Sequence, residues 1–264
     1  MKYFTPAEAR TMRGLRLVLT CGQPGSWGES AKKILEYKGI DYIPVAQYSG
    51  QENRDLVAWT GIRNAPVAVY EDEPPRSGWY DILVLAERLA PERPLLPESS
   101  EARATVVGIS AEICSEWGFG WVRRVMMTAP RPSVELAVLP PADFPLKPEE
   151  IETIARAYGA YTNDPVQAER RAADIMRMLA ARLHRQKAAG SPYLVGDGIT
   201  ACDIYWTCFS MMLKPLPHDV NPMPGFVRAA YETGGPVMEA AKDPILLEHR
   251  AMMYDRHLKL PLDY

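Results

Sequence analysis

Cysteine is scarce in this sequence, and the few cysteines present do not form a metal or redox motif. Four occur in 264 residues, at Cys21, Cys114, Cys202 and Cys208. None belongs to a Cys-x-x-Cys pair or stands at a metal-ligand spacing from another cysteine or a histidine. The pattern therefore favours neither a metal centre nor a disulfide-stapled secreted scaffold. We expect reduced thiols in a reducing compartment, three of them filling the core.

Long apolar runs and an excess of one charge are also absent. No window approaches the roughly 20 apolar residues that cross a bilayer, and the N-terminal stretch lacks the apolar centre of a secretory signal. The 30 basic and 33 acidic residues are interspersed and leave a formal charge of -3, too small to attract phosphate backbones or anionic membranes. We therefore predict a cytoplasmic protein with neither nucleic acid nor a membrane as its partner.

Strand and helix patterns alternate in the first part of the chain. A short β-prone run covers 15–20, and helical spacing over 29–38 stops at Gly39. This order predicts a small α/β layer. Further strands are predicted over 41–47 and 66–70, further helices over 51–60 and 80–89, and the turn 71–77 has room for a short fourth strand.

A proline-rich linker separates this layer from a second part in which every pattern is helical. Pro91, Pro94 and Pro97 fall within seven residues, a density that neither a helix nor a sheet accommodates. We therefore predict two domains, 13–92 and 101–264, joined by the linker 93–100. Helices are predicted over 101–125, 149–161, 165–186, 200–212, 225–231, 237–241 and 244–257, with a proline-rich connection at 128–147.

The segment 193–209, YLVGDGITACDIYWTCF, predicts how one of these helices begins. Thr200 and Asp203 have the spacing of a capping box, in which each side chain binds the backbone N–H of the other residue. Ile199 and Ile204 are placed to close over it as a hydrophobic staple. The apolar residues that follow direct this helix into a core. Thr200 and Asp203 are therefore predicted to serve folding.

The Gly-Asp loop and the Thr-Ala-x-Asp sequence of this segment resemble the core motif of the helical domain of the cytosolic glutathione transferase superfamily. Other stretches are similar to that family in the same order: its first helix and second-strand entry at 29–42, its Asn-Ala-Pro-Val turn at 64–67, its third helix at 81–91 and its linker at 95–97. The resemblance implies an α/β thioredoxin-like N-terminal domain followed by an all-α C-terminal domain. It also implies glutathione as co-substrate, no metal, and a homodimer.

By this resemblance, a turn and a helix N-terminus hold the glutathione backbone. The cysteinyl part lies along Ala65, which precedes a cis bond to Pro66, and Asn64 either contacts the tripeptide or caps its own turn. The γ-glutamyl part lies at the start of the third helix, where free N–H groups bind a carboxylate. The family usually places Glu-Ser or Gln-Ser there, and this chain has Gly78-Trp79. The acidic partner of the amine is therefore missing unless a residue nearby supplies it: Glu71, Asp72 or Asp81.

A transferase must also stabilise the glutathione thiolate, because a free thiol has a pKa of about 8.5. The family uses a Tyr or Ser hydroxyl, or a cysteine that forms mixed disulfides. Aligning on the 29–39 helix puts Cys21 at the tyrosine position and Ser26 at or next to the serine position. Ser26 is the first choice for the thiolate donor, unless it only caps the helix. Cys21 is the second choice, unless it is inert packing. Trp27 is expected to wall the sulfur site or to cover the helix end.

The second substrate is expected between the domains. Trp117, Phe119, Trp121 and Met126 offer adaptable apolar surface for a hydrophobic electrophile, although each could instead pack in the core. The two glycines of this run indicate a bend or a close approach. No role is assigned to the histidines of the C-terminal helix. The hypothesis is an enzyme that conjugates glutathione to a hydrophobic electrophile. Its alternatives are a catalytically silent binding or scaffold protein of this fold, and a Cys21-based thiol oxidoreductase.

Overall fold

A three-stranded sheet forms the centre of the first domain. The computed structural model describes residues 1–128, 148–157, 159 and 162–264. Strand β1 (Leu15–Thr20) lies between β2 (Ile43–Gln47), which is parallel to it, and β3 (Val67–Tyr70), which is antiparallel. The sequence left room for a short fourth strand in the turn 71–77. The structure has an isolated bridge there, between Ala68 and Arg76.

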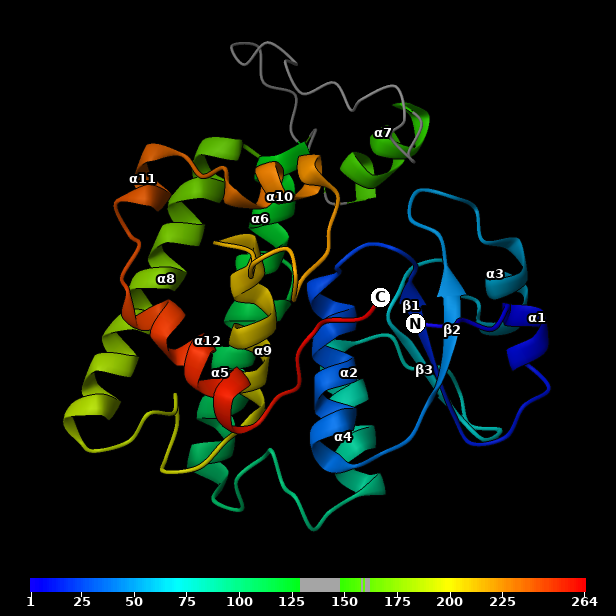
Figure 1. Cartoon of the computed structure of the whole chain (residues 1–264), viewed down its shortest axis with the longest axis horizontal. Coiled ribbons are helices and arrows are strands. Elements are labelled where there is room, and N and C mark those ends of the chain that lie inside the picture. Colours follow the sequence, from blue (N-terminus) through cyan, green and yellow to red (C-terminus); the bar gives the residue numbers. More distant parts are fainter. Residues whose placement is uncertain (129–147, 158, 160–161) are drawn as a thin grey trace.

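Helices cover both faces of this sheet (Figure 1). α2 (Ser26–Lys38) crosses from β1 to β2, as a parallel pair requires, and ends at Gly39 as predicted. α2 and α4 (Trp79–Leu89) lie between the sheet and the helical half, while α1 (Pro6–Ala9) and α3 (Arg54–Thr60) cover the opposite face. Alternation along the strands separates two cores: Leu15, Leu17 and Leu19 pack with α2 and α4, whereas Val18, Val45 and Val67 pack with Leu56 of α3.

The residues before position 13 also belong to this layer. Phe4 forms a parallel bridge with Val45 of β2. Helix α1, which the sequence patterns did not predict, begins with a capping box between Thr5 and Glu8. The domain boundaries 13–92, 93–100 and 101–264 stay predictions.

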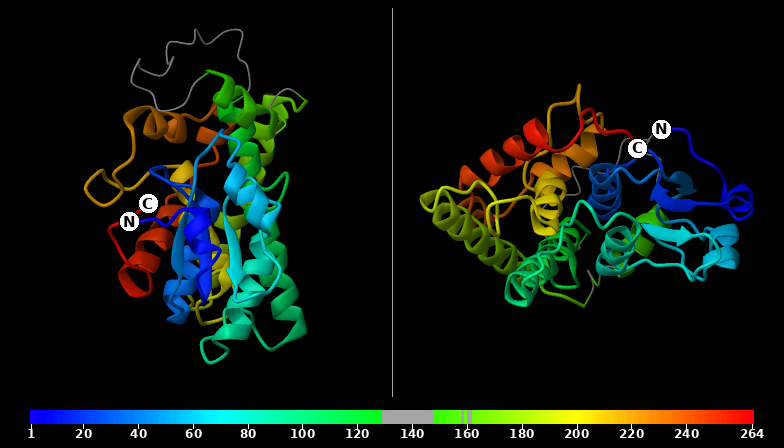
Figure 2. Two further views of the ribbon diagram at one scale, coloured as in Figure 1. Left: turned by 90° about the vertical axis from the view of Figure 1, so that its right-hand side faces the viewer. Right: turned by 90° about the horizontal axis from the view of Figure 1, so that it is seen from below.

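All regular elements after β3 in the described chain are helices. The view from below in Figure 2 shows the helical half packed beside α2 and α4, away from the sheet. No described helix is long and apolar enough to span a bilayer, and no three His, Cys, Asp or Glu side chains among the described residues are grouped to hold a metal. The elements after α4 are α5 (Ser100–Cys114), α6 (Phe119–Thr128), α7 (Pro148–Ala157), α8 (Pro165–Ala188), α9 (Ala201–Phe209), the 3-10 helix η1 (Ser210–Met212), α10 (Gly225–Glu232), α11 (Pro236–Glu239) and α12 (Ile245–Arg256).

The helix predicted over 101–125 is two helices, α5 and α6, joined by a tight turn. The chain turns because Trp117 takes a left-handed conformation, with φ of 64°. Gly118 then passes so close to three carbonyl oxygens that a Cβ would lie 2.8–2.9 Å from them. The bend that the glycines indicated is therefore real. Most of the predicted connection 128–147 lies outside the described residues.

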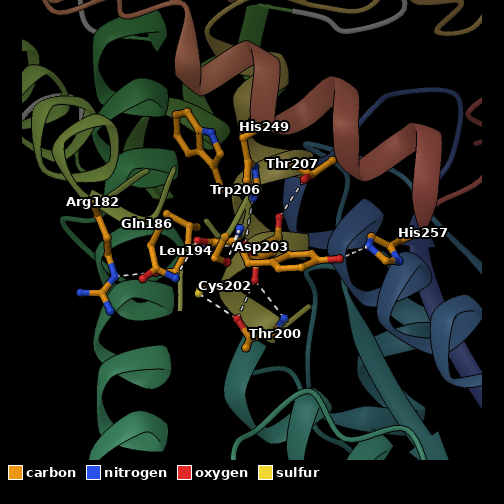
Figure 3. A network of polar contacts seen from close by, with 12 residues as sticks. Arg182, Gln186, Leu194, Thr200, Cys202, Asp203, Trp206, Thr207, His249 and His257 are labelled. Atoms are coloured by element: carbon orange, nitrogen blue, oxygen red, sulfur yellow. Dashed lines mark hydrogen bonds and ion pairs between the residues drawn. The ribbon is translucent and has the colours of Figure 1, made fainter. Parts of the chain in front are cut away.

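Helix α9 is buried along its whole length, and its first turn is the polar centre of the helical half (Figure 3). The predicted capping box of Thr200 and Asp203 is confirmed. The Asp203 carboxylate accepts hydrogen bonds from the Thr200 N–H (2.9 Å), the Thr200 hydroxyl (2.7 Å) and the Leu194 N–H (2.7 Å). His249 of α12 donates a fourth from Nε2, at 2.9 Å, so this histidine has a structural role that the sequence did not reveal.

The C-terminal residues after α12 return to the first domain, so that the two chain ends lie close together (Figure 1). The α-amino group of Met1 pairs with the carboxylate of Asp263. Lys33 of α2 donates to the carbonyl of Lys259 at 2.9 Å. This return ties the two parts of the chain to each other at a second place besides the linker.

Candidate functional site

A cleft of about 400 Å³ opens between the two halves, within the range of small-molecule sites. Its walls come from the ends of β1 and β2, the turn before β3, the first turn of α2, the start of α4, the end of α5, and helices α6 and α7. The lining residues are Thr20, Trp27, Gln47, Ser49, Gly50, Gln51, Arg63, Asn64, Ala65, Pro66, Ser77, Gly78, Trp79, Cys114, Ser115, Glu116, Trp121, Thr153, Ile154 and Ala157.

The turn before β3 presents its backbone to this cleft. The Ala65–Pro66 peptide bond is cis, as the resemblance implied, and Asn64, Ala65 and Pro66 all line the cleft. No hydrogen bond joins the Ala65 N–H or C=O to any other residue that the structure describes. Because a backbone N–H or C=O without an internal partner can form a hydrogen bond with a ligand, this edge can bind an extended peptide.

The start of α4 borders the same cleft. Gly78 is the N-cap and has no side chain with which to satisfy the first N–H groups, which stay available to an anion. The Trp79 indole N–H donates to the Ser115 hydroxyl at 3.0 Å and so joins the two domains. The acidic side chain that the family usually places at this helix start is missing here. None of the three candidates to replace it lines the cleft: Glu71, Asp72 and Asp81. Glu116, from the turn after α5, does.

Trp27 is the second aromatic link between the halves. Its indole N–H donates to the Cys114 carbonyl at 2.8 Å, and its ring meets the edge of Phe209 with centroids 4.9 Å apart. Trp27 therefore forms part of the cleft wall and is held there by two contacts with the helical half, while its expected place beside a sulfur site stays a prediction.

Ser26 does not line the cleft. As a helix cap it would stand just before the first residue of α2, but α2 begins at Ser26 itself. Gly25 is the N-cap, so Ser26 is neither the cap nor exposed: it is fully buried within the first turn. Its hydroxyl has no hydrogen-bond partner among the described residues. The structure thus separates Ser26 from the residues that line the cleft.

Cys21 does not line the cleft either. It is half-buried at the end of β1, and its N–H donates to the Gln47 carbonyl at 3.0 Å. Burial raises the pKa of the Cys21 thiol, and a separate backbone hydrogen bond from Gln47 to the sulfur opposes the shift. A reactive cysteine needs the opposite shift, since the thiolate is the nucleophile. Cys114, Cys202 and Cys208 are buried, as expected for core thiols.

Alkylation by iodoacetamide tests the state of Cys21. With a raised pKa, the thiolate fraction at neutral pH is smaller than for free cysteine, so we expect slower labelling whose pH midpoint lies above that of the free amino acid. Mass spectrometry of the native protein measures it, and the Cys21→Ser variant should remove the signal. A midpoint below that of free cysteine would instead support the oxidoreductase alternative.

Of the four residues expected to bind the second substrate, Trp121 alone lines the cleft. Phe119 is fully buried and meets Trp206 edge to face at 5.3 Å between centroids, and Met126 is also part of the core. Trp117 sits half-buried in the turn after α5, away from the cleft lining.

Several lining residues were not foreseen from the sequence. Thr20 and Gln47 are the last residues of two predicted strands. Polar residues at strand ends that meet at one edge of a sheet often line a binding site, so the sequence contained a signal for both. Arg63, Ser77 and Glu116 lie in turns that gave no signal. Thr153, Ile154 and Ala157 reach the cleft from α7, whose placement depends on tertiary packing.

Comparison with solved structures shows the same architecture throughout the chain. A glutathione S-transferase from Xanthobacter autotrophicus Py2 is similar with a TM-score of 0.58 at 18% identity, over 94% of this chain and 96% of that one. One from Methylobacillus flagellatus KT, solved with GSH bound, gives 0.60 at 14% identity over 92% and 95%. One from Methylobacterium radiotolerans, in complex with glutathione sulfonate, gives 0.57 at 15% over 92% and 91%. No family model and no curated protein matches the sequence.

The chain is thus a two-part protein, a thioredoxin-like α/β layer followed by an all-helical half, with a cleft between them. This is the fold of the cytosolic glutathione transferases, as the sequence resemblance implied.

Proposed function

We propose that the protein is a glutathione transferase that binds glutathione in this cleft and directs its thiolate at a hydrophobic electrophile. The observation that carries the proposal is the free backbone edge of Ala65 in the cleft, close to the uncapped start of α4. An extended peptide with a carboxylate at one end fits both features. The glutathione and glutathione sulfonate bound in two similar structures also support it.

The lining residues suggest how the tripeptide would lie. Its cysteinyl backbone would pair with Ala65, and its γ-glutamyl carboxylate would meet the first N–H groups of α4. Glu116 offers the acidic partner for the adjacent amine, from the other domain. Trp121 and Ile154 offer apolar surface for the electrophile at the helical side of the cleft.

Binding is the first test. We expect immobilised glutathione to retain the protein, and glutathione at about 100 times its Kd to add about 2.7 kcal/mol to the free energy of unfolding. Differential scanning calorimetry measures the second effect. A γ-Glu-Ala-Gly tripeptide, which has the same backbone without the thiol, should stabilise the protein as well. If neither peptide binds, the proposal fails.

The catalytically silent alternative shares the binding and differs in the chemistry. The Gly78-Trp79 pair in place of the family's Glu-Ser or Gln-Ser favours it. A panel of aromatic halides and unsaturated carbonyl compounds separates the two, since the enzyme accelerates at least one conjugation and the binding protein accelerates none. A homodimer, formed by the first domain of one subunit against the helical domain of the other, and a cytoplasmic location remain part of the proposal.

A further inference from the structure

Neither residue first chosen to hold the thiolate lines the cleft, so the cleft needs another donor. Five hydroxyl side chains line it: Thr20, Ser49, Ser77, Ser115 and Thr153. Two belong to the helical half, across the cleft from the start of α2: Ser115, which accepts from Trp79, and Thr153, which donates to the Glu149 carbonyl at 2.8 Å. Ser77 directly precedes Gly78, the N-cap of α4, where the carboxylate end of the peptide would lie.

Of the remaining two, Ser49 lies in the turn after β2, and Thr20 lies nearer in the chain to the start of α2. It ends β1, immediately before the loop that leads to the N-terminus of α2. Val18, Val45 and Val67 share one face of the sheet. Because side chains alternate along a strand, the same face continues two residues further toward the cleft. There it carries Thr20 at the end of β1, Gln47 at the end of β2 and Ala65 two residues before β3.

The Thr20 hydroxyl is already oriented at this edge. It donates to Gln47 Oε1 at 2.8 Å, from the directly paired position on β2. The Gln47 amide is itself fixed, since its Nε2 donates to the carbonyls of Tyr48 (3.1 Å) and Arg63 (3.4 Å). Rotation of the hydroxyl alone would transfer its hydrogen bond from a neutral amide oxygen to an anion, and hydrogen bonds to charged acceptors are the stronger kind.

We propose that Thr20 is the residue that donates a hydrogen bond to the glutathione thiolate, and that Gln47 is its positioning residue. The inference rests on the proposed function. The thiol proton leaves to solvent, the sulfur keeps the electron pair, and the Thr20 O–H bond stays intact. The positive end of α2, whose first turn carries the cleft residue Trp27, favours the same anion.

The Thr20→Val variant tests this, because valine keeps the shape of threonine and removes the hydroxyl. We expect the pKa of bound glutathione, followed by the ultraviolet absorbance of the thiolate, to rise by about 1–2 pH units. The conjugation rate at neutral pH should fall about 10- to 100-fold in parallel. Affinity for S-methylglutathione, which has no ionisable thiol, should not change. Thr20→Ser should restore most of the loss.

The possible failures are distinct. If the wild-type protein binds neither glutathione nor S-methylglutathione, the proposed function is wrong and this inference falls with it. If both bind and Thr20→Val titrates like the wild type, Thr20 is not the donor while the proposed function survives. A rise in pKa on Ser26→Ala but not on Thr20→Val would return the role to Ser26. Equal loss of affinity for both ligands in Thr20→Val would reduce Thr20 to a structural residue.

Discussion

Replacing Asp203 by alanine is expected to lower the free energy of unfolding by about 3–5 kcal/mol. The carboxylate is fully buried and accepts from two backbone N–H groups, one hydroxyl and one imidazole. Its removal leaves those donors without partners in a place that water does not reach, and removes the cap of a helix that is buried along its whole length. Urea denaturation followed by circular dichroism measures the loss.

Two further variants show whether the network or the charge matters. Asp197→Ala is the matched control, because Asp197 lies in the same loop and is exposed, so its loss should stay within about 0.5 kcal/mol. His249→Ala removes one of the four donors and should cost less than Asp203→Ala. If Asp203→Ala unfolded at the urea concentration of the control, the network would not hold the helical half together.

The same network marks what sequence can and cannot predict about this fold. The capping box of Thr200 and Asp203 was predictable, because its two residues are three apart and both features are local. The bond from His249 was not, because the histidine is 46 residues away and its direction depends on how α12 packs on α9. The strand β1 and the stop of α2 at Gly39 were likewise local, whereas the break between α5 and α6 needed the conformation of Trp117.

The candidate site divides in the same way. The turn at Ala65–Pro66 could be located from its motif, and Trp27 and Trp79 from their place at helix starts. The hydroxyl group that faces the cleft could not be located in this way. A shift of one residue in the start of α2 decides whether Ser26 points into the core or outward. Sequence therefore locates the backbone turn of this cleft better than it locates the hydroxyl groups that line it.

Gly120→Ala is expected to destabilise the protein by about 2–3 kcal/mol, although alanine is the better helix former. A Cβ at this position in α6 would lie 2.2 Å from Cε1 of Phe209 and 3.0 Å from the Trp27 ring. Phe209 is fully buried and cannot move away. Trp27 lines the cleft, so the proposed function also predicts that glutathione will bind more weakly to this variant. Thermal unfolding and calorimetric titration measure the two effects.

The control for this prediction is Gly108→Ala in α5. Gly108 is exposed, and a Cβ there meets nothing within 4 Å, so the substitution should stabilise the protein by about 0.5–1 kcal/mol through helix propensity alone. The opposite signs of two identical chemical changes would show that the space at Gly120 is reserved for the rings of Phe209 and Trp27. If both variants gained stability, the contact between α6, α9 and the cleft wall would be looser than these distances require, and Trp27 would not depend on the helical half for its position.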